Sequence, residues 1–171
     1  MVDFLVIGPF SAYAYKNIFP LIKDQKIKLG YNRVGEFSDG IKFGNINWFT
    51  SFDVEEKGYL KLKEYKEGDY SKFDNYDAIN IDRVEDIPDY DGVMGVPMTF
   101  LEKWNPEQFE LIGFPDIGIV PEGWKGMTEE FVRLYYEQGN TGCYKEGCIS
   151  AYFVKDGKAI LPYVRLLIKK K

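Results

Sequence analysis

Short apolar runs separated by glycine, proline and polar residues make up the first part of the chain, and they predict strands and one helix. The run 4–7, stopped by a Gly-Pro pair, is typical of a strand buried on both faces of a parallel sheet. Residues 12–23 carry apolar side chains at helical spacing, with Ser11 as N-cap and Pro20 as a residue that shortens or kinks the helix. Because residues 27–31 predict a second strand, this order indicates the edge of an α/β sheet.

The pattern across residues 41–52 predicts a strand around which the rest of the fold is organised. Gly44 and Asn45 lead the backbone into it, and Trp48 and Phe49 place two large aromatic side chains near its end. Such a pair lines a pocket for a planar ligand or closes a hydrophobic core. The residues alone leave both interpretations open.

The second half of the chain alternates short strands with glycine-rich turns. Residues 57–70 fit either a strand that runs into a loop or a polar helix. The other predicted elements are a strand at 78–82, a strand at 93–97 with a helical turn at 99–104, a strand at 110–113, a helix at 128–137 capped by Thr128, and a hairpin of 149–154 with 159–168 around Asp156-Gly157. No repeat or linker interrupts the series, so we expect one domain over residues 1–171.

Composition narrows the classes of site that the chain can hold. With 171 residues, 45% hydrophobic and 17% aromatic, it is expected to fold around its own core. It has no long apolar run and no secretory leader, so we expect a cytoplasmic protein without a membrane association. Histidine is absent, which excludes serine triads and most zinc sites, and we expect no metal. Cys143 and Cys148 are expected to be free thiols, with a reversible disulfide as the alternative.

Acidic residues are concentrated in one stretch. Residues 64–91 contain ten acids and three basic residues, a net charge of −7 within a total of −5. The stretch is either a solvated connection or a negatively charged docking surface that mimics DNA. The candidates for such an interaction surface are Asp82, Glu85, Asp86, Asp89 and Asp91. Because no basic stripe is present, we expect DNA binding by this chain to be weak or to depend on a partner.

Several segments, taken in order, resemble the EcoRI-type family of adenine-specific DNA methyltransferases. The most specific is Tyr-Asp-Gly-Val-Met-Gly-Val-Pro-Met-Thr-Phe-Leu at 90–101, continued by Asn-Pro-Glu-Gln-Phe-Glu at 105–110. The other segments are 4–8, 14–23, 44–50, 76–82 and 164–168. The resemblance implies an α/β fold with a partial Rossmann-like methyltransferase sheet and a C-terminal β-hairpin. The resemblance also covers the acidic stretch, so we expect its charge to be inherited from the family.

Enzymes of this family hold S-adenosylmethionine with a glycine-bearing loop and an acidic residue, and they orient the adenine amine with an Asn/Asp-Pro-Pro-Tyr/Phe loop. In family members both lie upstream of the segment that matches Met1, so we expect this chain to lack them. The nearest substitute, Gly-Pro-Phe-Ser at 8–11, has no side-chain acceptor at its first position, so no catalytic residue is expected. The resemblance places Trp48, Phe49 and Asn45 near the pocket for the flipped base.

Two functions are compatible with these observations. In the first, the chain is a methyltransferase-like protein derived from an adenine-specific DNA methyltransferase and is inactive alone. It then binds no cofactor unless a partner supplies the missing loops. In the alternative, it is a phage or mobile-element protein that inhibits a bacterial defence nuclease by binding it, as an anti-CRISPR does. In either case the expected exposed strand edge at 4–7 predicts a protein partner or self-association, in a bacterial or phage-infected cell.

Overall fold

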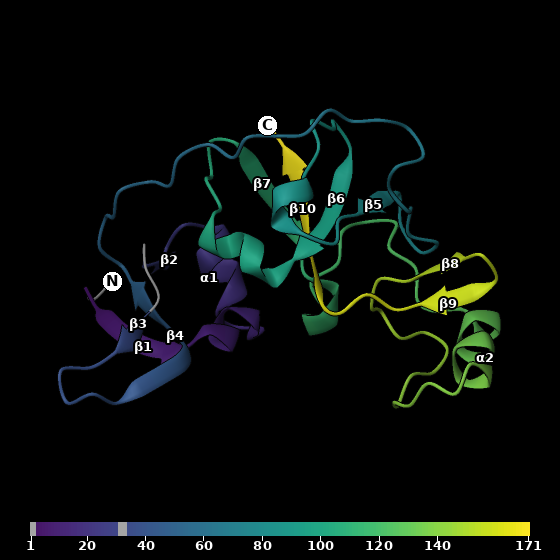
Figure 1. Ribbon diagram of the computed structural model, residues 1–171, viewed down its shortest axis with the longest axis horizontal. Coiled ribbons are helices and arrows are strands. Elements are labelled where there is room, and N and C mark those ends of the chain that lie inside the picture. The colour runs from purple at the N-terminus through teal and green to yellow at the C-terminus, as the bar shows by residue number, and fades with distance from the viewer. Residues whose placement is uncertain (1–2, 31–33) are drawn as a thin grey trace. The chain divides into compact units, whose positions relative to one another are not determined.

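The computed structural model describes residues 3–30 and 34–171 of the chain. These residues form two compact units, each with its own sheet (Figure 1). The N-terminal unit contains residues 1–58 and 101–105, and the C-terminal unit contains residues 59–100 and 106–171. The single methyltransferase-like domain expected over the whole chain stays a prediction.

β4 (Lys42–Thr50) is the central strand of the N-terminal unit, and it confirms the strand predicted at 41–52. It pairs antiparallel with β1 (Leu5–Pro9), β2 (Lys28–Leu29) and β3 (Val34–Glu36). Since every other strand of this sheet pairs with β4, this strand determines the register of the whole sheet.

β1 confirms a strand near 4–7, but the predicted burial and parallel pairing are wrong. The strand is antiparallel to β4, with Ile7 opposite Trp48. Its apolar side chains are exposed, Leu5 by 55% and Val6 by 49%. An apolar run indicates a strand but not the number of its neighbours. β1 and β2 both pair with β4, so this segment is not the edge of a parallel sheet.

β2 is shorter than the strand predicted at 27–31. It covers two residues, which pair with the end of β4. Residue 31 lies outside the described part of the chain.

The helix predicted at 12–23 is divided into two short helices. η1 (Phe10–Ala14) is a 3-10 helix, and α1 (Phe19–Lys23) follows it. Pro20 lies in the first turn of α1, where its missing N–H group costs no intrahelical hydrogen bond. Ser11 lies inside η1 and does not act as its N-cap.

The C-terminal unit is built on a mixed sheet with the strand order β5-β6-β10-β7. β5 (Ala78–Asn80) runs parallel to β6 (Val93–Pro97), and β10 (Arg165–Lys170) lies antiparallel between β6 and β7 (Phe109–Gly113). Side chains from all four strands are buried in its core: Ile79, Met94, Val96, Phe109, Leu111, Leu166, Leu167 and Ile168. The three strands predicted at 78–82, 93–97 and 110–113 are therefore confirmed to within two residues.

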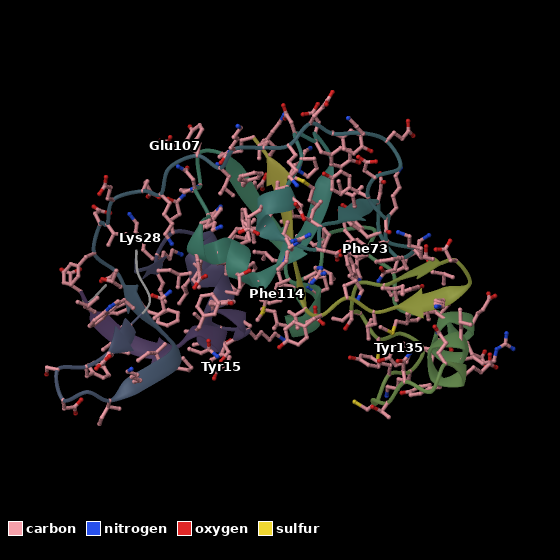
Figure 2. The ribbon with its side chains drawn as sticks, in the orientation of Figure 1. Tyr15, Lys28, Phe73, Glu107, Phe114 and Tyr135 are labelled. Atoms are coloured by element: carbon pink, nitrogen blue, oxygen red, sulfur yellow. The ribbon has the colours of Figure 1, made fainter. Side chains whose placement is uncertain are left out.

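Short 3-10 helices and irregular segments connect these strands. η2 (Val84–Asp86) follows β5, η3 (Met98–Glu102) forms the turn predicted at 99–104, and η4 (Pro115–Ile117) follows β7. Residues 57–70 form neither the regular strand nor the helix considered for them. The rings of Phe73 and Phe114, labelled in Figure 2, are buried in the C-terminal unit.

α2 (Glu129–Glu137) confirms the predicted helix and its cap. The Thr128 hydroxyl accepts a hydrogen bond from the N–H group of Phe131 at 3.2 Å, as an N-cap does. Phe131 packs against Tyr152 with ring centroids 4.1 Å apart. The helix is thus held to the hairpin region by aromatic contacts.

β8 (Phe153–Lys155) and β9 (Lys158–Ile160) confirm the predicted hairpin. Asp156 and Gly157 form its turn with φ angles of 50° and 72°, which a glycine tolerates at little cost. The prediction that its second arm continues to residue 168 is wrong, because that arm ends with β9. The residues of β10 pair instead with both β6 and β7, and two neighbouring strands provide more hydrogen bonds than one.

The fold is therefore a mixed α/β architecture with several sheets and few helices. Within the described residues, no helix is long and apolar enough to cross a membrane.

Candidate functional site

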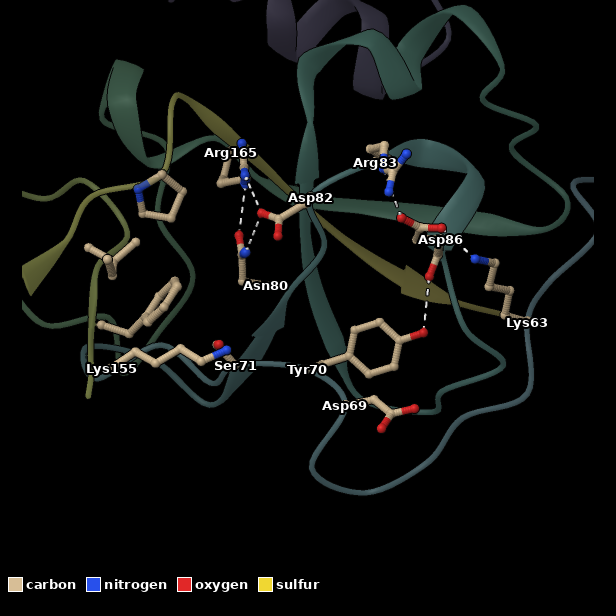
Figure 3. Close-up of a pocket in the computed structure, with 13 residues that line it drawn as sticks. Lys63, Asp69, Tyr70, Ser71, Asn80, Asp82, Arg83, Asp86, Lys155 and Arg165 are labelled. Atoms are coloured by element: carbon tan, nitrogen blue, oxygen red, sulfur yellow. Dashed lines mark hydrogen bonds and ion pairs between the residues drawn. The ribbon is translucent and has the colours of Figure 1, made fainter. Parts of the chain in front are cut away.

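A polar cavity of about 630 Å³ opens in the C-terminal unit (Figure 3). Residues from β5, η2, the β8–β9 hairpin and the start of β10 line it, together with the irregular segment before β5. Its lining residues are Lys63, Asp69, Tyr70, Ser71, Asn80, Asp82, Arg83, Asp86, Phe153, Lys155, Ile160, Pro162 and Arg165. Charged groups of both signs thus face one space beside aromatic and aliphatic side chains.

Arg165, the first residue of β10, is the buried cation of this cavity, with an exposed fraction of 7%. Its Nε–H group donates to Asn80 Oδ1 at 2.9 Å and an Nη2–H group donates to Asp82 Oδ1 at 3.3 Å. An Nη1–H group donates to the carbonyl oxygen of Tyr163. Burial lowers the pKa of Arg165, while the nearby Asp82 carboxylate raises it. The guanidinium stays charged, because arginine loses its proton only far above neutral pH.

The strand register explains how these residues meet. The parallel pairing of β5 and β6 sets Asn80 opposite Gly95, and β10 sets Arg165 opposite Pro97 on the other side of β6. A Cβ atom at Gly95 would lie 2.5 Å from the Phe73 ring and 3.6 Å from the Arg165 Cβ atom. Glycine at this position therefore leaves room for the ring of Phe73 beside Arg165.

A second polar cluster, around Asp86, lies across the cavity (Figure 3). Lys63 and Arg83 both pair with the Asp86 carboxylate, Arg83 at 3.3 Å, and the Tyr70 hydroxyl donates to the Asp86 carbonyl at 3.2 Å. The hydrogen bond from Lys63 is the main reason why the pKa of Asp86 lies below its ordinary value.

Most of the predicted interaction-surface acids form ion pairs within the chain. Asp82 pairs with Arg165, and Asp89 and Asp91 both pair with Lys170, the latter at 3.0 Å. Asp86 forms two further pairs, with Lys63 and Arg83. The cations lie mostly outside the acidic stretch, so counting charges along the sequence did not find them. Glu85 is exposed, and the role of all five acids as a docking surface stays a prediction.

Asp116, in η4, connects this site to the loop before the hairpin. Its Oδ1 atom accepts a hydrogen bond from the Ser150 hydroxyl at 2.9 Å, and its Oδ2 atom accepts one from the N–H group of Arg165 at 3.4 Å. Loss of solvent around the carboxyl raises the pKa of Asp116, and the hydrogen bond from Ser150 opposes this effect. The residue as a whole stays exposed, so the effect on stability is screened and small.

The raised pKa of Asp116 predicts a pH dependence of stability. Because the folded state binds the proton more tightly than the unfolded state, the stabilisation is fully present below the ordinary pKa of 3.8 and is lost as pH rises through the folded pKa. We expect the free energy of unfolding, relative to that of Asp116→Asn, to fall as pH rises above the ordinary pKa of 3.8. Urea titrations at several pH values measure this. An unchanged difference would contradict the prediction, and the exposed Asp77→Asn serves as control.

The predicted base-pocket residues lie on β4 of the N-terminal unit. Asn45 is exposed, Trp48 is half-buried, and Phe49 is buried with an exposed fraction of 5%. Consecutive strand residues point to opposite faces, so the two rings do not form one wall. A Cβ atom at Gly30 would lie 2.6 Å from the Trp48 Cβ atom, which indicates close packing there. Their role near a flipped base stays a prediction.

The structure does not indicate a metal centre among the residues it describes, where no group of three or more acidic or cysteine side chains could hold an ion. Cys143 is exposed and Cys148 is half-buried, and both are free thiols. Sequence reasoning missed Arg165 as a functional candidate. The signal that could have found it is an arginine inside the strand predicted at 159–168, in the segment 164–168 that resembles the family.

Comparison with known proteins identifies the family of the chain. The family model described as "Adenine-specific methyltransferase EcoRI" matches residues 32–171. The type II methyltransferase M.EcoRI of Escherichia coli is 43% identical over 195 aligned residues, which cover 98% of this chain and 50% of that protein. M.MpnI of Mycoplasma pneumoniae is 36% identical, and M.MgeORF184P of Mycoplasma genitalium is 34% identical. Each alignment covers 64% of this chain, and 43% and 44% of those proteins, respectively.

No solved structure matches the chain. The chain spans about half the length of the curated relatives it matches. The family model nevertheless covers most of its residues, and the similarity to M.EcoRI extends over nearly all of them. The chain therefore belongs to the EcoRI family of adenine-specific methyltransferases.

Proposed function

We propose that this chain is a part of an adenine-specific DNA methyltransferase of a type II restriction–modification system, which contacts DNA but does not transfer methyl groups alone. The observation that carries the proposal is the 43% identity to M.EcoRI over 98% of the chain. The cavity around Arg165 supports the DNA contact, because it combines N–H donors, carboxylate acceptors and aromatic rings in one space. DNA modification also favours a cytoplasmic location.

The chemistry of the reaction supports the proposal that the chain does not transfer methyl groups alone. Methyl transfer to the adenine amine needs oxygen acceptors that orient and deprotonate it, and the family provides them on an Asn/Asp-Pro-Pro-Tyr/Phe loop. This motif does not occur in the sequence of 171 residues. Gly8, at the start of the nearest substitute, lies within β1 opposite Asn47 and contributes no side-chain oxygen. The catalytic acceptors would then come from residues other than these.

We propose that the described residues of this chain do not form a site for S-adenosylmethionine by themselves. The early glycine, Gly8, lies inside a strand and not in a loop after one, so it provides no backbone cradle for a cofactor. We therefore propose that the cofactor binds only when further residues complete a Rossmann-like methyltransferase sheet, and we derive no step through it. The parallel pair of β5 and β6 is the part of the present sheets that such a fold would include.

A methylation assay tests the proposal. The purified chain is incubated with S-adenosylmethionine labelled in its methyl group and with unmethylated bacterial DNA, and M.EcoRI on the same DNA is the positive control. We expect no label in the DNA above the level without protein, and no heat of cofactor binding by calorimetry. Label that increases with the concentration of the chain would contradict the proposed inactivity. Duplex binding measured by fluorescence anisotropy tests the DNA contact separately.

The alternative, an inhibitor of a defence nuclease, has no support from the relatives found, all of which are named methyltransferases. The ion pairs of Asp82, Asp86, Asp89 and Asp91 also reduce the negative surface on which that alternative depended. We therefore do not propose it.

We also propose that a protein partner or a second copy of this chain pairs with the free edge of β1. Among the described residues, β1 pairs with β4 alone, and its side chains Leu5, Val6 and Ile7 are exposed by 55%, 49% and 38%. Unpaired apolar edge strands favour pairing with another chain, and a charged side chain at such an edge opposes it.

This edge predicts concentration-dependent association. We expect light scattering after size exclusion to detect species larger than 19.8 kDa in the wild type, and Val6→Lys to shift them towards the monomer. Val154→Lys, at an exposed valine of β8, is the matched control and is expected to leave association unchanged. A wild type that stays monomeric at all concentrations would contradict self-association and leave a different partner chain as the remaining form of the proposal.

A further inference from the structure

We propose that Arg165 reads the edge of a guanine in the DNA to which this chain binds. The inference rests on the proposed function and specifies it, because it assigns a base-reading role to one residue of the cavity in the C-terminal unit. It is carried by the buried, prearranged guanidinium group and by the mixed charge of the space in front of it.

The guanidinium has donors left for a ligand. It carries five N–H groups in a plane, and within the described part of the chain three of them have partners: the oxygens of Asn80, Asp82 and Tyr163. Two N–H groups remain at a residue that lines the cavity. Guanine offers two acceptors, O6 and N7, on its major-groove edge, and arginine is the commonest side chain to bind both.

The contacts that hold Arg165 also fix its orientation. Asn80 Nδ2 donates to Asp82 Oδ1 at 2.9 Å, so the two residues that bind the guanidinium also bind each other. Such a group loses little rotamer freedom when a ligand binds, because most of that freedom is lost on folding. A prearranged planar donor pair suits a flat base edge of fixed geometry.

The carboxylate that binds Arg165 favours a base over a phosphate at this position. Four cationic side chains and three carboxylates line the cavity, but the Asp82 carboxylate binds the same guanidinium that a phosphate would approach. A phosphate beside that group would therefore be repelled. A guanine edge is neutral. The cytosine paired with it presents an amino group, from which a carboxylate can accept a hydrogen bond. The Asp82 side chain is 81% exposed, so it is accessible to such a donor.

Next to Arg165 the chain exposes an aromatic ring. Tyr163 is exposed by 79%, and its carbonyl group accepts a hydrogen bond from Arg165. An exposed ring beside a hydrogen-bonding group fits a nucleic-acid surface, where bases stack on aromatic side chains.

Selection from a randomised duplex library, followed by base substitution, tests the inference with the full chain. The duplex enriched by the wild type is resynthesised with each guanine replaced in turn by 7-deazaguanine, which lacks N7 but still pairs with cytosine. We expect one position at which this replacement weakens wild-type binding by about tenfold in fluorescence anisotropy. Arg165→Gln should bind the two duplexes equally. Arg133→Gln, the same change on the exposed face of α2, should keep the wild-type difference.

Other outcomes overturn the inference. If Arg165→Gln weakens all duplexes alike, the contact is to phosphate. If 7-deazaguanine weakens wild-type binding at no position, DNA binds elsewhere on the chain. The proposed function then stands without the guanine contact of Arg165. If no duplex binds at all, the DNA contact of the proposed function fails first. Circular dichroism checks that Arg165→Gln is folded. If this variant does not fold, Asp82→Asn is tested in its place, since the Asp82 side chain is exposed. We expect Asp82→Asn to reduce the 7-deazaguanine effect about threefold.

Discussion

Replacing Phe109 by alanine is expected to lower the free energy of unfolding of the C-terminal unit by about 3–5 kcal/mol. Phe109 begins β7 and is fully buried, and its ring meets that of Phe100 edge to face with centroids 5.3 Å apart. Alanine would leave a cavity beside Phe100 and between strands that cannot collapse without breaking their pairing with β10. Urea unfolding followed by circular dichroism measures the change.

The control for this variant is Phe52→Ala, which removes the same atoms from a side chain that is 48% exposed. We expect it to change stability by less than about 1 kcal/mol. Equal effects of the two variants would mean that Phe109 does not lie in a packed core, and would contradict the arrangement of β7 and β10.

Replacing Asn75 by alanine is the second change with a large expected effect, about 3 kcal/mol. The side chain is buried with an exposed fraction of 1%. Its Nδ2 group donates to the carbonyl oxygens of Lys125 and Ser150 at 3.0 and 3.1 Å, and its Oδ1 atom accepts from the N–H group of Tyr152 at 3.4 Å. Alanine would leave the buried N–H group of Tyr152 and two partly buried carbonyl groups without these partners, and losing a buried partner costs more than the hydrogen bond itself contributes.

Hydrogen exchange gives this prediction a local measurement. The amide of Tyr152 should exchange faster in Asn75→Ala, because its acceptor is removed. Asn140→Ala is the control: Asn140 is exposed, and its Nδ2 group donates to the carbonyl of Tyr135 at 3.0 Å. Since water can replace that contact, we expect a change of less than about 1 kcal/mol. An unaltered Tyr152 exchange rate would show that Asn75 does not hold this loop.

The family could be inferred from the sequence, and so could the positions of most elements. β4, β6 and α2 lie where pattern and capping predict them, because alternation, β-branched residues and the Thr128 cap are local signals. The incorrect predictions concern which strands pair with each other. The pattern of β1 does not reveal that it has one partner strand, and that of residues 159–168 does not reveal that the segment is shared between a hairpin and a sheet.

The residues of the candidate site could also be predicted only in part from the sequence. Sequence reasoning selected Asp82 and Asp86 for their charge, and both lie in the cavity. It interpreted them as candidates for a negatively charged docking surface and did not find their partners Lys63 and Arg165, which are separated from Asp86 and Asp82 by 23 and 83 residues. No periodicity or spacing connects residues so far apart. Only Arg83, the other partner of Asp86, lies close to it in the sequence.

The sequence by itself determined the family, the absence of histidine chemistry, the central strand β4 and the helix α2. Each depends on residue identity or on neighbours within one turn or one strand. Only the tertiary structure decided that Arg165 meets Asn80 and Asp82, that Asp82, Asp86, Asp89 and Asp91 form ion pairs, and that β1 is exposed. These features depend on strand order and register, which arise from packing between distant segments and not from local preference.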